Sequence, residues 1–236
     1  RLGVAFEAGM RKKGCITKEK EFFKSCLLHR QLFFCIIKLR WVSFAIDIAE
    51  ILNYKEEDTM RVGMLTSGGD CQSLNATMRG VAKTLYNQRK DVEIIGFIEG
   101  YRGLIYEDYR IMKSKDFSGI LTNGGTILGT SRQPFKLMRV PDENGLDKVE
   151  AMKNTYKKLK LDCLVVLGGN GSQKTTNLLR QEGLNVIGLP KTIDNDLWGT
   201  DVTFGFQSAI NLATQTIDCI HTTAASHGRV FIVEVM

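Results

Sequence analysis

From Met60 onward, short apolar runs alternate with longer segments in which apolar residues recur at helical spacing. The short runs predict buried strands, which we place at residues 61–67, 92–98, 161–169, 184–190 and 229–236. The longer segments predict amphipathic helices at residues 72–88, 146–160, 172–183 and 206–224. This alternation predicts an α/β fold, with a mostly parallel sheet and helices on both of its faces.

Residues 1–59 differ from the rest of the chain in composition. They contain no Pro, and their Gly all precede residue 15, whereas the remaining 20 Gly and all 3 Pro follow Met60. The stretch "MRVGMLTSGGD" also resembles a natural beginning, with a Met, one basic residue and then a strand. We therefore expect an N-terminal extension at residues 1–59 that is not native to the domain at 60–236. A genuine helical arm is the alternative.

Composition narrows the class of partner. The chain is 43% hydrophobic and 25% charged, which is typical of a soluble globular protein. Its net charge of +6 is not gathered into a long basic run, so we expect no nucleic-acid partner. The apolar N-terminal stretch is interrupted by charges too often to span a bilayer, so we expect no membrane partner. Cys163 and Cys219 lie in apolar patterns and predict buried free thiols in a reducing, cytoplasmic location.

Glycine-rich loops follow several of the predicted strands. In a parallel sheet, ligands bind beyond the carboxyl ends of the strands, so these loops should converge. Glycine lets backbone amides approach an anion, and the N-terminus of a following helix favours negative charge. Several such loops predict a polyphosphate site, although each alone is more often a tight turn. The loops are "TSGGDCQSLN", "TNGGTILGTSRQPF" and "GGNGSQKT".

The segment "LPKTIDNDLWGTD" follows the fourth predicted strand and gathers three carboxylates. A phosphate-rich site needs Mg²⁺, which carboxylates and phosphate oxygens bind. Phosphoryl transfer to an alcohol also needs a group that accepts the hydroxyl proton. Asp194 and Asp196 are two positions apart and would share a face of an extended segment, one as base and the other near the metal. Lys191 would either neutralise phosphate charge or lower the pKa of the carboxylates. The alternative is a turn that merely carries acidic residues.

Five motifs together resemble the 6-phosphofructokinase family, in order and spacing, from Met60 to Met236: "TSGGDCQSLNA", "GGTILGTSR", "LVVLGGNGS", "GLPKTIDNDLWGTD" and "SHGRVFIVEVM". The resemblance implies a Rossmann-like three-layer lobe that binds the phosphoryl donor. It implies transfer of a phosphoryl group, with Mg²⁺, to the 1-hydroxyl of fructose 6-phosphate, and a homo-oligomer, dimeric or tetrameric. A second, smaller lobe follows in the family. We therefore expect a truncated chain that is inactive alone, or a non-catalytic regulatory subunit.

The resemblance also implies roles for individual residues. Asp194 matches the family's general base, Thr192 a contact to the reacting end of the sugar, and Asp196 a carboxylate near metal and sugar. Arg229 matches an arginine that reaches the sugar phosphate of a neighbouring subunit, and Met236 a sugar-contacting methionine. Arg132 and Gly68 match residues beside the transferred phosphate. The implied donor-binding set is Gly68, Gly69, Arg132, Gly169, Asn170, Gly171, Ser172 and Lys191.

Three departures from the family pattern bear on metal and donor. Asn170 stands where the family usually has an Asp that helps to bind Mg²⁺, so the implied metal site of Asn170 and Asp196 has one charge fewer. Gly171 is typical of ATP users, whereas Lys191 is common among pyrophosphate users. We favour ATP as the donor, with pyrophosphate as the alternative. Gln72 and Ser73 replace a Pro-Gly pair near the donor.

Overall fold

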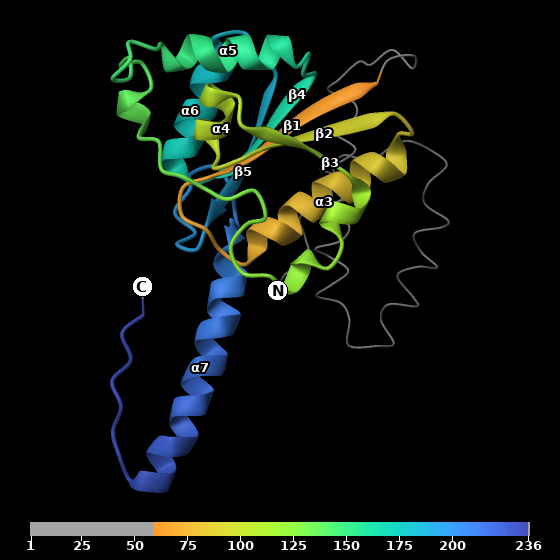
Figure 1. Ribbon diagram of the computed structural model, residues 1–236. Helices are drawn as coiled ribbons and strands as arrows, with labels where there is room; N and C mark the ends of the chain where they lie inside the picture. Colours follow the sequence, from red (N-terminus) through yellow and green to blue (C-terminus); the bar gives the residue numbers. More distant parts are fainter. Residues whose placement is uncertain (1–58, 236) are drawn as a thin grey trace, which may run out of the picture. The chain divides into compact units, whose positions relative to one another are not determined.

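The computed structural model of the protein describes residues 59–235 (Figure 1). Its sheet has the strand order β3-β2-β1-β4-β5-β6. Every pair is parallel except β2 with β3, so the predicted mostly parallel sheet is confirmed. The strands are β1 (Met60–Ser67), β2 (Val92–Phe97), β3 (Tyr109–Met112), β4 (Cys163–Gly168), β5 (Val186–Thr192) and β6 (Phe204–Gly205).

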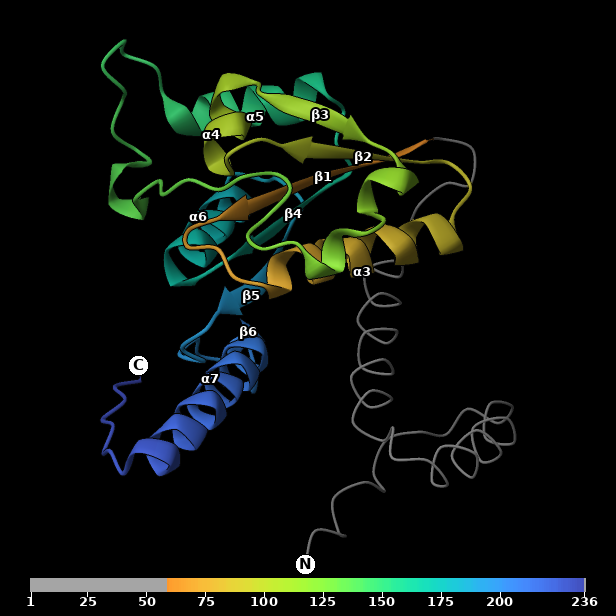
Figure 2. The same ribbon diagram turned by 60° about the horizontal axis from the view of Figure 1, so that its bottom comes forward.

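Helices cover both faces of this sheet, as predicted. Figure 2 shows α3 on one face and α4 and α5 on the other. The core between the sheet and α4, α5 and α6 includes Leu65, Phe97, Leu104, Met152 and Leu179, all fully buried. The α-helices are α3 (Ser73–Gln88), α4 (Tyr101–Tyr106), α5 (Lys148–Lys158), α6 (Asn170–Gln181) and α7 (Phe206–His227). Three short 3₁₀ helices are η1 (Ser114–Phe117), η2 (Ile120–Thr122) and η3 (Phe135–Leu137).

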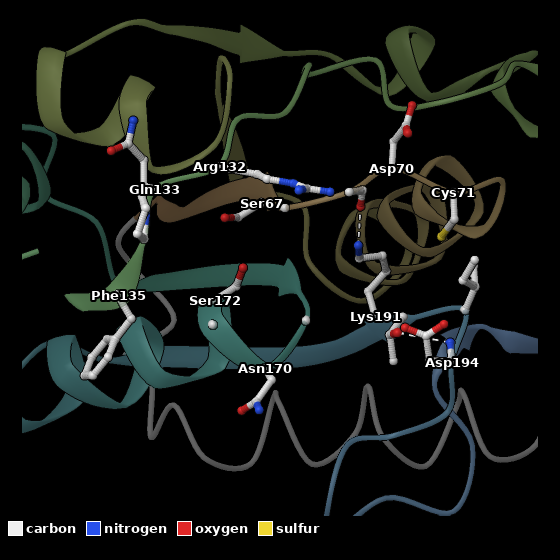
Figure 3. Close-up of a pocket in the computed structure, with 17 residues that line it drawn as sticks. Ser67, Asp70, Cys71, Arg132, Gln133, Phe135, Asn170, Ser172, Lys191 and Asp194 are labelled. Atoms are coloured by element: carbon white, nitrogen blue, oxygen red, sulfur yellow. Dashed lines mark hydrogen bonds between the residues drawn. The ribbon is translucent and has the colours of Figure 1, made fainter. Parts of the chain in front are cut away.

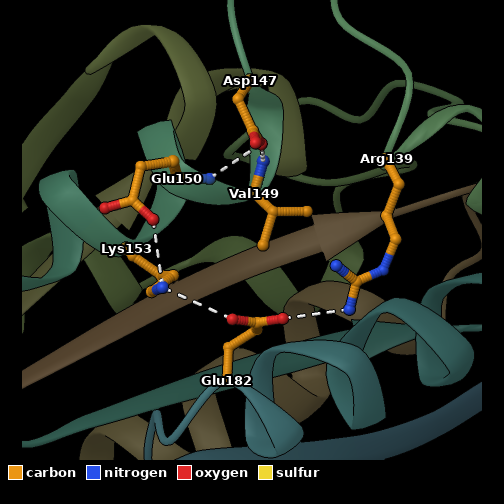
Figure 4. Close-up of polar contacts among 6 residues, drawn as sticks. All are labelled: Arg139, Asp147, Val149, Glu150, Lys153 and Glu182. Atoms are coloured by element: carbon orange, nitrogen blue, oxygen red, sulfur yellow. Dashed lines mark hydrogen bonds and ion pairs between the residues drawn. The ribbon is translucent and has the colours of Figure 1, made fainter.

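A chain of ion pairs links α5, the end of α6 and the loop that precedes α5 (Figure 4). The Glu182 carboxylate pairs with Arg139 at 3.0 Å and with Lys153 at 3.4 Å, and Lys153 also pairs with Glu150 at 3.0 Å. Asp147 caps α5 by accepting hydrogen bonds from two backbone amides of its first turn. Arg139 and Lys153 hold the pKa of Glu182 below its ordinary value. These contacts tie the loop after Arg132 to α6.

The predicted fifth strand at 229–236 is wrong for the part that the structure describes. Residues 229–235 have no regular secondary structure, and Val230 and Ile232 are 92% and 96% exposed. A strand needs a neighbouring strand for its backbone hydrogen bonds. Within the described residues, the segment that follows α7 has no such neighbour. None of the residues of α7 is buried. For the same reason Cys219 is exposed rather than buried.

The other cysteine prediction is confirmed, because Cys163 in β4 is buried, and burial raises the pKa of its thiol to about 12. Within residues 59–235, no helix is both long enough and apolar enough to cross a membrane. The expectation of an extension at residues 1–59 lies almost entirely outside the described residues.

Candidate active site

The carboxyl ends of β1, β4 and β5 meet at one cavity of about 490 Å³. The chain leaves β1 for β2 on one side, while β4 pairs with β1 on the other, so the cavity lies at the point where the strand order reverses. Open α/β sheets bind ligands at this point. The lining residues are Ser67, Gly68, Gly69, Asp70, Cys71, Arg132, Gln133, Pro134, Phe135, Gly169, Asn170, Gly171, Ser172, Lys191, Thr192, Ile193 and Asp194 (Figure 3).

The loop after β1 is held against the loop that carries Arg132. Gly68 adopts a φ of +89°, which favours glycine because it has no β-carbon. Its amide donates to the Ser131 carbonyl at 3.2 Å, and the Thr130 hydroxyl donates to the Gly68 carbonyl at 2.7 Å. These bonds bring the Arg132 guanidinium to within 4.0 Å of the position of a β-carbon on Gly69. Arg132 thus reaches across the cavity beside exposed glycine backbone (Figure 3).

The N-terminus of α6 forms the facing wall. Gly169 caps the helix without a side-chain hydrogen bond, so the first amides of α6 face the cavity with the positive end of the helix dipole. Ser172 is buried, and its carbonyl accepts a hydrogen bond from the buried Tyr101 hydroxyl at 2.9 Å. A β-carbon on Gly171 would meet no atom within 4 Å. This wall can therefore receive an anion without rearrangement.

Lys191, near the end of β5, is the buried cation of the site. Its side chain crosses the cavity, and its ammonium donates to the carbonyl of Gly69 (Figure 3). Lys191 is only 5% exposed, and burial lowers the pKa of its ammonium. The neighbours Cys71, Asp70 and Asp194 act in the opposite direction. Lys191 and Arg132 therefore give the cavity two cations suited to phosphate oxygens.

Asp194 lies in the loop after β5, and hydrogen bonds between residues of this loop hold its shape. The Asp194 amide donates to the Thr192 hydroxyl at 3.1 Å. Asn195 has a left-handed backbone with φ of +53°, and its side-chain oxygen accepts from the Thr203 amide at 2.9 Å. The left-handed turn ends the extended backbone, so the expected shared face of Asp194 and Asp196 is wrong. Asp194 and Asp196 are both exposed, but only Asp194 lines the cavity.

Most of the predicted site residues come together in the described structure. Those that line the cavity are Gly68, Gly69, Arg132, Gly169, Asn170, Gly171, Ser172, Lys191, Thr192 and Asp194. Arg229 lies beyond α7, is exposed and does not line the cavity, and Met236 is outside the described residues. The prediction missed Ser67, Asp70, Cys71, Gln133, Pro134, Phe135 and Ile193. All seven lie within the loops and the acidic segment quoted in the sequence analysis, next to residues that were predicted, and this proximity was the available signal.

Between residues 59 and 235, no three or more His, Cys, Asp or Glu side chains gather to hold a metal ion. The residues that line the cavity include Asp70, Asp194 and Asn170, whose side chains carry oxygen atoms of the kind that bind Mg²⁺. Mg²⁺ is commonly bound by one or two carboxylates together with substrate phosphates, rather than by a cage of protein ligands. The donor set therefore fits Mg²⁺ only in the company of a phosphate ligand.

Glycine backbone, a helix N-terminus and two cations at the switch point of a parallel sheet give this α/β protein a cavity whose groups are suited to phosphate. The family profile described as Phosphofructokinase matches residues 61–236. The chain belongs to the phosphofructokinase family.

The relatives and the solved structures that resemble this chain are also phosphofructokinases. The chain is 60% identical over 189 residues to the ATP-dependent 6-phosphofructokinase of Spirochaeta thermophila, covering 77% of this chain and 50% of that protein. It is 49% identical over 178 residues to ATP-dependent 6-phosphofructokinase 3 of Bacteroides thetaiotaomicron, covering 75% and 52%. The fold matches phosphofructokinase from Saccharomyces cerevisiae with a TM-score of 0.65 and 31% identity, over 75% of this chain and 26% of that one. The chain thus spans about half the length of the curated relatives it matches.

Proposed function

We propose that the protein works as an ATP-dependent 6-phosphofructokinase, which transfers a phosphoryl group from ATP to the 1-hydroxyl of fructose 6-phosphate. The observation that carries this proposal is the position of Asp194 in one cavity with Arg132, Lys191 and the glycine loops. The proposal is supported because a carboxylate lies in the same cavity as groups suited to phosphate, and phosphoryl transfer to an alcohol requires both a proton acceptor and a phosphate site.

Each wall of the cavity has a part in the proposed reaction. The α6 N-terminus and Arg132 bind the donor's phosphate oxygens and stabilise the charge that develops on the transferred group. The Asp194 carboxylate accepts the proton of the sugar hydroxyl, and Thr192 contacts the reacting end of the sugar. The Lys191 ammonium holds the Gly69 carbonyl and keeps the loop after β1 in place. Positioning and electrostatics therefore supply the catalysis.

Mg²⁺ is the cofactor that this reaction needs. Asn170 at the start of α6, with the cavity carboxylates, would hold it together with the donor's phosphates. When bound, the ion supplies positive charge that neutralises those phosphates. Asp196 belongs to the proposed metal set by family resemblance, although its side chain is outside the cavity lining.

ATP is favoured over pyrophosphate as the donor. The relatives at 60% and 49% identity are named ATP-dependent. Open space beside Gly171 also supports a nucleotide, because the α-phosphate and ribose need room that a side chain would fill. Lys191 supports the second candidate, pyrophosphate. Pyrophosphate has no nucleoside to add binding contacts, so it depends more on positive charge such as the buried Lys191 ammonium.

Of the residues assigned to the sugar, only Thr192 and Asp194 line the cavity in the described structure, so the sugar side of the site is incomplete there. We infer that the second half of the relatives' length supplies the remaining sugar-phosphate contacts, and that the exposed apolar residues of α7 pack in the complete homo-oligomer. The buried free thiol of Cys163 is consistent with a cytoplasmic enzyme.

The test uses this chain extended by the second half of the S. thermophila protein, which we call the extended enzyme. A coupled assay should detect fructose 1,6-bisphosphate when ATP, Mg²⁺ and fructose 6-phosphate are all present. This chain alone is the matched control and should bind ATP without turnover. An extended enzyme that folds and binds ATP but never phosphorylates the sugar would refute the proposal. Activity with pyrophosphate alone would select the second candidate.

A further inference from the structure

The side chain of Gln173 bridges the ends of the two strands from which the facing walls of the cavity emerge. Its Nε2 donates to the Gly168 carbonyl of β4 at 2.9 Å and to the Leu189 carbonyl of β5 at 2.9 Å. A glutamine amide has two hydrogens on this nitrogen, so both are used in the bridge. β4 and β5 also pair directly here, with Gly168 opposite Pro190.

The bridge lies immediately before both functional loops. Gly168 is followed by Gly169 and the start of α6, which form the proposed donor wall. Leu189 is followed two residues later by Lys191, and then by Asp194 on the proposed acceptor side. The same turn of α6 is held from α4 by the Tyr101 hydroxyl, which donates to the Ser172 carbonyl. Gln173 thus supplies the corresponding restraint toward β5.

Gly188 in β5 makes room for this amide. A β-carbon on Gly188 would lie 2.0 Å from the Gln173 Oε1 and 3.1 Å from its Cδ. Any side chain at position 188 would therefore force the Gln173 amide to move. The backbone of Gly188 has an ordinary negative φ, so alanine is conformationally acceptable there. A substitution at Gly188 therefore moves the end of a flexible side chain rather than the sheet, and it removes the bridge at little cost to folding.

We propose that Gln173 is a positioning residue that sets the separation between the donor wall at the start of α6 and the segment that carries Lys191 and Asp194. The inference rests on the proposed function, because it assigns these two walls to donor and acceptor. Phosphoryl transfer depends on the alignment of the two substrates, and a displacement of about 1 Å can lower the rate by roughly 100-fold. A side chain that contacts neither substrate can therefore control turnover.

The first experiment measures hydrogen–deuterium exchange on this chain itself. Gly188→Ala and Gln173→Met, which keeps the length of the side chain but removes both donors, should each speed exchange of residues 189–194 by about fivefold or more. Gln181→Met is the matched control, because Gln181 is exposed at the other end of α6. Exchange that is the same in all three variants and the parent would overturn the inference.

The second experiment measures kinetics of the extended enzyme. Gly188→Ala and Gln173→Met should lower kcat by about tenfold, whereas KM for ATP and the thermal midpoint should change little. A joint fall in kcat, ATP binding and thermal midpoint would mean a merely structural role and would overturn the inference. If the unsubstituted extended enzyme has no activity, the proposed function fails, while the exchange measurement still decides whether Gln173 holds the two walls.

Discussion

Lys191 and Gly69 are 122 positions apart, and the ammonium of one donates a hydrogen bond to the backbone carbonyl of the other. The bond joins the end of β5 to the loop after β1 across the mouth of the cavity. It also keeps a cation in a position that is only 5% exposed. The site therefore holds positive charge where a phosphate is expected, in a place where water solvates that charge poorly.

This buried charge should make Lys191→Met equal to or more stable than the parent at pH 7. Burial lowers the pKa of Lys191 in the folded state below its ordinary value of 10.5, so the unfolded chain binds the proton more tightly. The buried ammonium therefore lowers the free energy of unfolding. This destabilisation is fully present below the pKa of Lys191 in the folded state and disappears as pH rises toward 10.5. Thermal unfolding at pH 7 and pH 10 should show the parent gaining stability relative to the variant. Lys174→Met, at an exposed position of α6, is the control. A thermal midpoint of Lys191→Met that lies far below that of the parent at both pH values would contradict the prediction.

Asp194→Asn tests the proposed base. Asparagine keeps the size of the side chain but cannot accept the sugar's proton, so kcat of the extended enzyme should fall by about 10²–10⁴-fold with much smaller changes in KM. Steady-state kinetics with both substrates measure the two effects separately. Asp201→Asn is the control, because Asp201 is an exposed carboxylate of the same loop that does not line the cavity. Near-normal turnover in Asp194→Asn would rule out the mechanism.

Gly171→Asp tests the choice of donor. A side chain at this position points into open space, so the fold should be undisturbed while the nucleotide is crowded and its α-phosphate repelled. We expect kcat/KM for ATP to fall by about 100-fold, which corresponds to a loss of about 3 kcal/mol, and any pyrophosphate-dependent activity to fall less. Gly171→Ala adds bulk without charge and should have the smaller effect on ATP. Equal losses with both donors would contradict the proposed position of the nucleotide.

Asn170→Asp should lower the Mg²⁺ concentration required for half-maximal activity. One added negative charge near the ion contributes roughly 1 kcal/mol at an accessible site, or about fivefold in affinity. A Mg²⁺ titration at saturating ATP measures the change. Asn177→Asp makes the same substitution at an exposed position of α6, outside the cavity lining, and controls for overall charge. An unchanged Mg²⁺ requirement would place the ion away from Asn170.

The continuous apolar run of β4 and the periodic segments of α3, α5 and α6 could be predicted because burial on both faces of the sheet leaves an unambiguous pattern. β3 was missed because it is an edge strand whose first three residues are exposed, so it lacks an apolar run. The segment at 229–235 has such a run and still forms no strand, since apolar composition does not supply a hydrogen-bonding neighbour.

The cavity could be located from the loops that follow β1, β4 and β5, because parallel topology brings those loops to one edge. Asp196 could not be placed correctly, since two-residue periodicity holds only while the backbone stays extended, and the left-handed Asn195 breaks it. The contacts of Lys191 with Gly69, and of Gln173 with Gly168 and Leu189, join segments whose spacing in the chain carries no signal.

The exposed residues after α7 have a practical consequence for handling the protein. Val230, Phe231, Ile232 and Val233 form four consecutive apolar residues of high β-propensity, and their backbone groups have no strand partner within the described structure. Short segments of this kind are those from which cross-β aggregates nucleate, and only Arg229 and Glu234 flank this one with charge. Preparations of this chain by itself will therefore self-associate more readily as concentration and ionic strength rise.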